Sequence, residues 1–489
     1  MVERRLSDLL GLTSDAASVM IKGITTDSRA VKRGDLFVAL PGVNVDGRDF
    51  IDAAVSKGAA AVLSTKGAVV PGGRVPLIEV SNPRREYADL SANFYQGQPE
   101  HMVAVTGTNG KTSVAEFTRQ LWAQLRLTSA SLGTLGVRSA PVERPGGLTT
   151  PDPMALHAAL YDLAKAGVTH AALEASSHGL DQYRLDGVNL QAAGFTNLTR
   201  DHLDYHGTEI SYLFAKARLF GELLSPDATA VINIDAPYGR EVDDLTWGRG
   251  LKRITVGRSE KATLQIIDVV PSVGAQALTV LADGKTHKIT IPLIGSFQAE
   301  NAVLAAGLVM ATGYSAEEVL PHIAKLKGVP GRMEFMGKTV SGGAVYVDYA
   351  HTPNGMETAL KAARAHNPSK ISIVFGCGGN RDKGKRPEMG KVAADGADNV
   401  IITDDNPRYE DAATIRSEVL AACPDALEIA DRKEAIAKAI NDLKKDEILM
   451  ITGKGHELGQ TVGDNILPHS DLAEVTRILS DQRRGVSDA

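Results

Sequence analysis

Short apolar runs alternate with longer amphipathic segments along most of the chain. This alternation is typical of βαβ units, in which helices join parallel strands. In the first hundred residues the pattern predicts elements that end at a Gly-Gln-Pro-Glu break over 97–100. They are strands within 34–42, 60–64 and 76–80 and helices over 49–59 and 84–96. We therefore expect a first α/β domain over residues 1–98.

The second part of the chain opens with an apolar strand over 101–106, and further strand-like runs follow at 170–179 and 228–235. Between 263 and 293, apolar residues alternate with a period of two around an Ala-Asp-Gly-Lys turn, which predicts two strands. A helical segment runs from 296 to about 329. A Pro-Gly break at 330–331 marks the next boundary. The expected domains are thus 99–329 and 330–489.

A strand followed by a polar loop occurs three times in the last part, over 371–386, 399–411 and 447–457. In an open parallel sheet, ligands bind outside the carboxyl ends of the strands. These three loops therefore predict a binding site at one edge of a third sheet. The whole chain is predicted to be of the α/β class.

Composition and charge narrow the function. The 489 residues are 43% hydrophobic and 23% charged, as in globular proteins. A net charge of −6 offers no basic surplus for neutralising phosphates, which argues against nucleic acid as a partner. No window approaches the length of apolar residues that spans a membrane, and no signal peptide is recognisable. We expect a cytoplasmic protein.

The stretch Gly-Thr-Asn-Gly-Lys-Thr-Ser over 107–113 predicts a nucleotide site. A strand precedes it and a helix follows, so backbone N–H groups and a helix N-terminus face an anion. Lys111 would reach the outer phosphates, and the Thr112 hydroxyl suits Mg²⁺. The usual loop has a glycine where Val105 stands. An ordinary strand–turn–helix is the alternative, but this combination of residues disfavours it.

Three other residues are candidates for metal chemistry. Glu174 and His202 each follow an apolar run and could ligate Mg²⁺. Taken alone, His202 or His206 is more typical of a surface histidine. Lys216 lies in an apolar helical run. A snorkelling lysine with its ammonium in water is favoured by sequence alone; a desolvated lysine with a lowered pKa could instead form a carbamate.

The three polar loops of the last part carry both signs of charge, with Arg381, Arg408 and Glu457 in successive loops. Arginine forms bidentate pairs with carboxylates, and glutamate can hold an ammonium group. Such a set suits a zwitterionic amino acid. Surface ion pairs explain the same residues equally well.

Taken together, the motifs resemble the Mur ligase family over nearly the whole chain. They are "TTDSRAVKRGDLFVALPG", "VTGTNGKTS", "LTTPDP", "EASSHGLDQYR", "TNLTRDHLDYHG", "FAKARLF", "VDYAHTP", "GNRDKGKRP", "DDNPR" and "TGKGHE". In this family the phosphate loop lacks the first glycine. The resemblance implies a UDP-binding N-terminal α/β domain, a central P-loop ATPase domain with a parallel sheet and a C-terminal Rossmann-like domain.

The resemblance also implies roles for individual residues. ATP would be bound by Gly107, Thr108, Asn109, Gly110, Lys111, Thr112, Ser113, Asn301, Arg332 and His351. The UDP-sugar-peptide would be bound by Ser28, Thr149, Thr150, Ser176, Gln182 and Arg184. Mg²⁺ would be held by Thr112, Glu174, His202 and Lys216, the last as N6-carboxylysine; Lys111, Glu174, His202 and Lys216 would be catalytic. The incoming amino acid would meet Arg381, Asp405, Asn406, Pro407, Arg408, Gly453 and Glu457.

The implied reaction starts when ATP phosphorylates the D-glutamyl carboxylate of UDP-N-acetylmuramoyl-L-alanyl-D-glutamate. An incoming amine then attacks the acyl phosphate. The Asp-Asn-Pro-Arg form at 405–408 resembles family members that add meso-diaminopimelate, whose extra carboxylate Arg408 could pair. L-Lysine is the nearest alternative, followed by a folylpolyglutamate synthase-like ligase and by a phosphate-loop regulatory NTPase. We expect a monomer.

Overall fold

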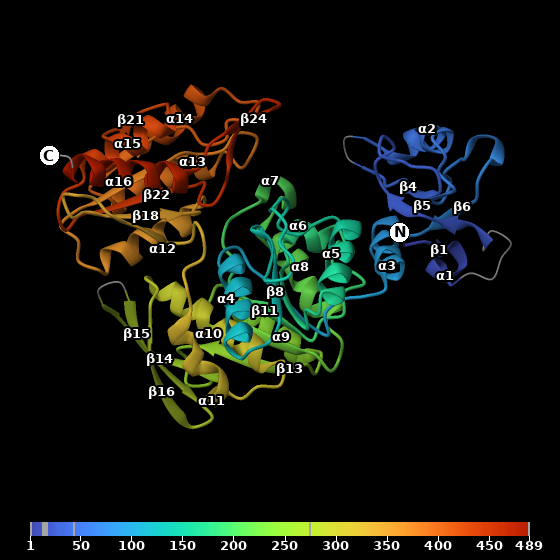
Figure 1. The fold of residues 1–489 in the computed structure, drawn as a ribbon, viewed down its shortest axis with the longest axis horizontal. Coiled ribbons are helices and arrows are strands. Elements are labelled where there is room, and N and C mark those ends of the chain that lie inside the picture. The colour runs from blue at the N-terminus through green and yellow to red at the C-terminus, as the bar shows by residue number, and fades with distance from the viewer. Residues whose placement is uncertain (1, 12–17, 43–44, 273–274, 488–489) are drawn as a thin grey trace.

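The computed structural model describes residues 2–11, 18–42, 45–272 and 275–487. These residues form three α/β units, each built on its own largely parallel sheet (Figure 1). The predicted fold class is therefore confirmed. The predicted boundaries, 98/99 and 329/330, fall between the sheets, and the limits of the domains stay a prediction. No helix among the described residues has the length and apolar character needed to cross a membrane.

The N-terminal unit has four parallel strands in the order β3-β4-β5-β6. They are β3 (Gly23–Thr25), β4 (Asp35–Val38), β5 (Ala61–Thr65) and β6 (Leu77–Val80). Around them lie β1 (Arg4–Arg5), β2 (Met20–Ile21), α1 (Leu6–Leu10), α2 (Ile51–Ser56) and α3 (Pro83–Tyr95). Helix α3 begins where the Asn82 side chain accepts a hydrogen bond from the Arg85 N–H, with Pro83 in the first turn. It then packs on α5 of the central unit.

The central unit holds a sheet with the order β16-β15-β14-β13-β12-β11-β7-β10-β8-β9 among the described strands. The strands from β14 to β8 are parallel, and the pairings at both ends of the sheet, β14–β15–β16 and β8–β9, are antiparallel. The strands are β7 (His101–Thr106), β8 (Ser129–Gly133), β9 (Gly136–Ser139), β10 (His170–Glu174), β11 (Ala192–Phe195), β12 (Thr229–Asn233), β13 (Lys252–Gly257), β14 (Leu264–Ser272), β15 (Ala275–Ala282) and β16 (Lys285–Ile291).

One strand prediction for this unit is wrong. Residues 263–293 contain three strands, β14 to β16, where the period-two pattern predicts two. A bulge between Ile266 and Asp268 shifts the alternation of side chains in β14. Such a shift hides a strand from a strict alternation pattern.

The helices of the central unit place the site. They are α4 (Lys111–Gln124), α5 (Pro153–Lys165), α6 (Ser177–Asp181), α7 (Leu203–His206), α8 (Glu209–Arg218), α9 (Gly239–Gly248), α10 (Ser296–Met310) and α11 (Ala316–Val319). Helix α10 packs against α4 and against strands β11 to β14, so it is buried almost all round. This packing brings the start of α10 to the start of α4, where the phosphate loop ends.

The C-terminal unit has the strand order β17-β18-β22-β19-β20-β21, parallel except for β17 at one edge. Its strands are β17 (Glu334–Lys338), β18 (Ala344–Asp348), β19 (Ile371–Phe375), β20 (Asn399–Ile402), β21 (Leu427–Glu428) and β22 (Ile448–Thr452), and a separate hairpin joins β23 (Gly459–Val462) to β24 (Asn465–Pro468). The helices are α12 (Pro353–Arg364), α13 (Lys385–Gly396), α14 (Ala412–Leu420), α15 (Arg432–Asp442) and α16 (Asp471–Ser487). As predicted, all three polar loops follow the carboxyl ends of parallel strands, namely β19, β20 and β22.

Candidate active site

The phosphate loop connects β7 to α4 and has room for glycine alone at two positions. A Cβ on Gly107 would lie 1.8 Å from Thr196 Oγ1, and a Cβ on Gly110 would lie 2.6 Å from Asn301 Oδ1. Gly110 also has a φ of +88°, a left-handed conformation that favours glycine. The loop is further held by Asn197, whose Oδ1 accepts a hydrogen bond from the Asn109 N–H at 3.0 Å. The loop is thus built into the sheet edge rather than free on the surface.

Two lysines converge on this loop. Lys111 Nζ donates to the carbonyl oxygens of Gly107 at 2.8 Å and Thr108 at 2.9 Å. Lys216 Nζ, from α8, donates to the same Gly107 oxygen at 2.8 Å and lies 4.4 Å from the centre of the Tyr212 ring. Burial lowers the pKa of Lys216 well below its usual value, and the Lys111 charge adds to the effect.

The snorkelling interpretation of Lys216 is wrong. Its side chain is buried, with 1% of the residue exposed, because α8 packs beneath the phosphate loop. It does not line the nucleotide cavity, unlike the other residues named as metal ligands. A desolvated amine of low pKa is the form that can take up CO₂.

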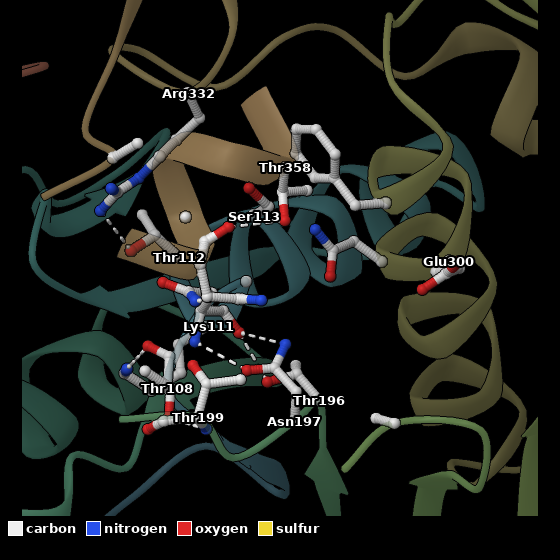
Figure 2. A pocket seen from close by; sticks show the side chains of 18 of the residues that line it. Thr108, Lys111, Thr112, Ser113, Thr196, Asn197, Thr199, Glu300, Arg332 and Thr358 are labelled. Carbon is white, nitrogen blue, oxygen red and sulfur yellow. Dashed lines mark hydrogen bonds between the residues drawn. The ribbon is translucent and has the colours of Figure 1, made fainter. Parts of the chain in front are cut away.

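Glu174, at the end of β10, is the centre of a hydrogen-bond network next to the loop. Its Oε2 accepts from the Thr112 hydroxyl at 2.9 Å, and its Oε1 accepts from the Thr134 N–H at 2.8 Å. The guanidinium of Arg332 donates to Thr112 Oγ1 at 3.0 Å and stacks on the ring of Tyr349, 4.1 Å away. Arg332 Nε is buried and has no hydrogen-bond partner among the described residues. Figure 2 shows Arg332 reaching Thr112 from above the loop.

Asp201 and His202 lie in the loop after β11, and His351 reaches them from the loop after β18 in the C-terminal unit. His202 Nε2 is 3.4 Å and His351 Nε2 is 3.9 Å from Asp201 Oδ2. Burial of Asp201 favours its neutral form, but the basic side chains of His202, His351 and Lys385 outweigh burial and lower its pKa. Burial lowers the pKa of His202 despite the nearby Asp201. A neutral imidazole at physiological pH is the form that ligates metals.

The residues expected to hold the sugar-peptide, apart from Ser28, form one connected group. The Thr150 hydroxyl bonds to the Glu174 carbonyl at 2.9 Å and to Ser176 Oγ at 3.0 Å. Arg184 donates to the Thr150 carbonyl at 2.8 Å and to Gln182 Oε1 at 2.7 Å. Thr149 reaches the same network through the Thr134 hydroxyl, at 3.1 Å. This group lies next to Glu174, whereas Ser28 lies in the N-terminal unit, in the loop after β3.

The residues expected to meet the amino acid gather in the loops after β19, β20 and β22. The Asn406 amide donates to Glu457 Oε2 at 3.0 Å, and the buried Lys454 Nζ bonds both Asn406 Oδ1 and Glu457 Oε2. Arg408 has a φ of +54° and donates through Nη1 to the Gly379 carbonyl at 2.9 Å. It has no acidic partner among the described side chains.

A cavity of about 520 Å³ runs along the phosphate loop. It is lined by both the central and the C-terminal units. Its lining contains most of the predicted phosphate-loop residues. It also contains the predicted residues Glu174, His202, Asn301, Arg332 and His351. Figure 2 shows Glu300 on α10 on the other side of Lys111 from Arg332. The cavity therefore extends from the phosphate loop toward α10 and the ends of β12 and β13.

Three family models match successive parts of the chain. They are "Mur ligase family, catalytic domain" over residues 20–95, "Mur ligase middle domain" over 105–309 and "Mur ligase, glutamate ligase domain" over 331–455. A curated UDP-N-acetylmuramoyl-L-alanyl-D-glutamate–2,6-diaminopimelate ligase of Bradyrhizobium diazoefficiens is 48% identical over 486 residues, 98% of this chain and 99% of that protein. The chain belongs to the Mur ligase family. Members of this family are ATP-dependent ligases that form amide bonds.

Solved structures of related proteins have the same fold as this Mur ligase. A solved structure of a UDP-N-acetylmuramoyl-L-alanyl-D-glutamate–2,6-diaminopimelate ligase is 33% identical, with a TM-score of 0.72, and covers 99% of this chain and 100% of that one. Folylpolyglutamate synthase of Mycobacterium tuberculosis, complexed with ADP and AMPPCP, has a TM-score of 0.61 at 21% identity. That match covers 76% of this chain and 92% of the synthase, and it shows the fold alone.

The donor set at the loop of this Mur ligase fits Mg²⁺. Thr112, Glu174 and His202 offer a hydroxyl, a carboxylate and an imidazole around one cavity. Within the described ranges, no group of three or more His, Cys, Asp and Glu side chains could hold a metal by itself. Mg²⁺ usually keeps waters and takes one or two carboxylates together with phosphate oxygens, so a sparse protein set is suitable.

Sequence reasoning missed several residues that line the cavity. They are Thr134, Asn233, Asp235, Arg258, Phe297, Glu300, Asp348, Tyr349, Asn354 and Thr358, among others. Burial raises the pKa of Glu300, against the effect of Arg258 nearby. Glu300 immediately precedes Asn301, a predicted ATP-binding residue, and this neighbourhood is the sequence signal that could have identified Glu300. Asp235 and Arg258 follow strands β12 and β13, and only the order of those strands brings them to the site.

Proposed function

We propose that this Mur ligase adds meso-diaminopimelate to UDP-N-acetylmuramoyl-L-alanyl-D-glutamate, at the expense of ATP, through an acyl-phosphate intermediate. The observation that carries the proposal is Arg408. Its guanidinium is half-buried and has no acidic partner among the described residues, although it lies among polar loops at the strand ends. Burial and the charge of Arg381 lower its pKa more than Asp405 and Glu457 raise it, so an anionic ligand would favour the charged guanidinium.

The loops after β19, β20 and β22 carry complementary groups for an amino acid with two carboxylates. Arg381 and Arg408 supply two guanidinium groups, and Glu457 supplies a carboxylate for an ammonium group. Diaminopimelate differs from lysine in its additional carboxylate. A site built around one polar group can reject the analogue that lacks it by about 10⁴-fold. L-Lysine would leave a partly buried arginine without its partner.

In the proposed mechanism, ATP lies along the cavity with its phosphates on the loop. Lys111 leaves the carbonyl oxygens of Gly107 and Thr108 and bonds the outer phosphates. The N-terminus of α4 and the guanidinium of Arg332, which is already at Thr112, face the same charge. The D-glutamyl carboxylate attacks the terminal phosphorus, and ADP leaves. The amine then attacks the acyl carbon, and phosphate leaves through a tetrahedral intermediate.

Thr112, Glu174 and His202 would hold Mg²⁺, which neutralises phosphate charge when bound. We propose that Lys216 is carbamylated. The buried Lys216 and the partly buried Lys111 donate to the same Gly107 oxygen, so positive charges on both would repel. A carbamate on Lys216 would replace this repulsion with attraction.

The remaining assignments belong to the same proposal. Ser28 would contact the uridine diphosphate, and Thr149, Thr150, Ser176, Gln182 and Arg184 would position the sugar-peptide beside Glu174. Gly453 borders the amino-acid pocket, because a Cβ there would lie 3.0 Å from Asp405 Oδ2. We place the reaction in the cytoplasm, where ATP and UDP-sugars are available, and expect a monomer.

A folate ligase is the weaker candidate. Residues 20–95 match the first Mur ligase family model, and the likeness to the folate enzyme leaves about a quarter of the chain uncovered. L-Lysine as the incoming amino acid remains the closest alternative.

The test is a phosphate-release assay. ATP, UDP-N-acetylmuramoyl-L-alanyl-D-glutamate and either meso-diaminopimelate or L-lysine are supplied together and with each component left out. We expect release only with all three substrates, and diaminopimelate strongly preferred to lysine. Equal rates with the two amino acids would refute the assignment of Arg408. Release that does not depend on the muramoyl dipeptide would refute the ligase reaction.

A further inference from the structure

Arg200 connects the nucleotide loops to the amino-acid loops across two units of the chain. It precedes Asp201 and His202 in the segment between β11 and α7. Its Nε lies 3.3 Å from Asp382 Oδ2, and its Nη1 lies 3.0 Å from Glu388 Oε1 on α13. Both carboxylates belong to the C-terminal unit.

The loop that Arg200 reaches carries Arg381. Asp382 is the next residue, its carboxylate is 13% exposed, and its Oδ1 accepts a hydrogen bond from the Gly384 N–H at 2.9 Å. The same loop also holds Arg408, because its Gly379 carbonyl accepts a hydrogen bond from Arg408 Nη1 at 2.9 Å. Both proposed carboxylate-binding arginines therefore depend on the position of this loop.

A second contact connects the loop to the nucleotide side. Lys385 Nζ donates to the carbonyl of His351 at 3.0 Å, and the His351 ring faces Asp201. The segment 381–385 is thus held at both ends by residues next to the cavity. Arg200 is the contact that comes from the central unit.

Gly384 provides the space that Arg200 occupies. A Cβ on Gly384 would lie 2.5 Å from Arg200 Nη2. The backbone of Gly384 has φ −61° and ψ −25°, which alanine adopts without strain. The Cβ would also lie 3.2 Å from Asp382 Oδ1, so both atoms that it would crowd belong to the side chains of the Arg200–Asp382 pair. Gly384→Ala should therefore move Arg200 without disturbing the fold.

We propose that Arg200 is a positioning residue, which sets the amino-acid loop in place relative to the nucleotide site so that the amine meets the acyl phosphate. Arg200 itself does not line the nucleotide cavity. If it is lost, the acyl phosphate forms but waits longer for the amine. Water then attacks it, which regenerates the D-glutamyl carboxylate and releases phosphate without an amide bond. The inference rests on the proposed function.

The test uses the single variants Arg200→Ala and Gly384→Ala and the double variant that combines them. Arg364→Ala is the control. Arg364 is a matched control, because its Nη2 pairs with Asp398 Oδ2 at 2.9 Å inside the C-terminal unit at similar exposure. Each enzyme is assayed for KM of diaminopimelate, for phosphate released per amide formed, for ATP affinity and for the midpoint of thermal unfolding.

For both single variants we expect KM for diaminopimelate to rise about fivefold, as suits partly exposed ion pairs. Phosphate released per amide should exceed one, while ATP affinity and the unfolding midpoint stay unchanged. The double variant should resemble Arg200→Ala, since Gly384→Ala has nothing left to displace. Arg364→Ala should behave as wild type.

Three results would overturn the inference. The first is that Arg200→Ala matches Arg364→Ala in KM for diaminopimelate and in phosphate released per amide. The second is that the increases in KM of the two single variants add in the double variant. The third is that the rise in KM is accompanied by a lower unfolding midpoint or a weaker ATP affinity, which would make Arg200 a structural residue only. Failure of the wild-type enzyme to use diaminopimelate is a different result and would refute the proposed function itself.

Discussion

Arg408 illustrates how one residue is prepared for a ligand. Its left-handed backbone is fixed by the neighbouring hairpin, because its N–H donates to the Thr461 carbonyl at 3.0 Å and its carbonyl accepts from the Gly463 N–H at 2.7 Å. The guanidinium is therefore positioned before any substrate arrives. Preorganisation of this kind reduces the entropy lost on binding.

We expect Arg408→Ala to lower kcat/KM for diaminopimelate about a hundredfold, because removing one partner of a desolvated charge pair leaves the other unpaired. ATP affinity should not change, since Arg408 does not line the nucleotide cavity. Steady-state kinetics and calorimetric titration with ATP would measure the two effects. An unchanged kcat/KM for diaminopimelate would contradict the assignment.

Lys216 gives a second prediction at the residue scale. Burial lowers its pKa and so favours the neutral amine, and enzyme equilibrated with ¹³C-bicarbonate should show a carbamate carbon resonance. The signal should be absent from Lys216→Arg, whose guanidinium stays protonated. Lys165, exposed on α5, serves as the control position, and Lys165→Arg should keep the signal. A spectrum without the resonance in the wild-type enzyme would exclude the carbamate.

At the scale of elements, the strongest patterns are read correctly from the sequence. Strand β7 has the predicted limits, 101–106, because an apolar run bounded by a Gly-rich loop has few alternatives. The polar loops after β19, β20 and β22 were found for the same reason. Lys216 was misread, because an isolated amphipathic helix leaves its lysine in water. Only the packing of α8 under the loop buries it.

The cavity residues missed from sequence share a physical cause. Asp235, Arg258 and Phe297 come from separate elements and match no short motif. They meet because β12 lies beside β13 and because α10 returns to the start of α4. Strand order is a long-range property that local periodicity does not contain. Residue types and loops were therefore predictable, and the far end of the nucleotide cavity was not.

Helix α5 carries a histidine that makes stability depend on pH. His157 is 2% exposed, and burial lowers its pKa to about 4. An unfolded chain would bind the proton near pH 6.5. The stabilising contribution of neutral His157 is thus present above pH 6.5 and is lost as the pH falls toward 4. Between pH 7 and pH 5 the loss is about 2 kcal/mol.

His157→Gln removes the titration and keeps a polar group near the Asp186 carbonyl, which His157 Nε2 contacts at 3.3 Å. The variant should have a lower free energy of unfolding than the wild type at pH 7. Between pH 7 and pH 5, however, its free energy of unfolding should fall by about 2 kcal/mol less than that of the wild type. Denaturant unfolding at both pH values would measure the difference. Equal losses in variant and wild type would show that His157 does not titrate in this range.

On the scale of the whole molecule, the nucleotide cavity belongs to two units. His351, Asn354 and Thr358 of the C-terminal unit line it together with the phosphate loop of the central unit. The Asn109 amide even donates to Asn354 Oδ1 at 3.4 Å. Binding of a nucleotide should therefore stabilise both units together.

We expect His351→Ala to weaken ATP binding about fivefold, although the phosphate loop belongs to another unit. Asn399→Ala is the control in the same unit, because Asn399 lies at the amino ends of the strands, away from the cavity. Titration calorimetry with a non-hydrolysable ATP analogue would measure both variants. Equal affinity in the two would assign ATP binding to the central unit alone.

The shared cavity also limits how such an enzyme can be rebuilt. A chimaera that takes its last unit from a relative with another amino-acid preference exchanges the wall of the ATP cavity at the same time. The junction residues His351, Asn354 and Thr358, and the partners of Arg200, would have to be carried over with the host chain. Amino-acid preference is thus better altered loop by loop, at 378–385 and 404–410, than by exchange of a whole unit.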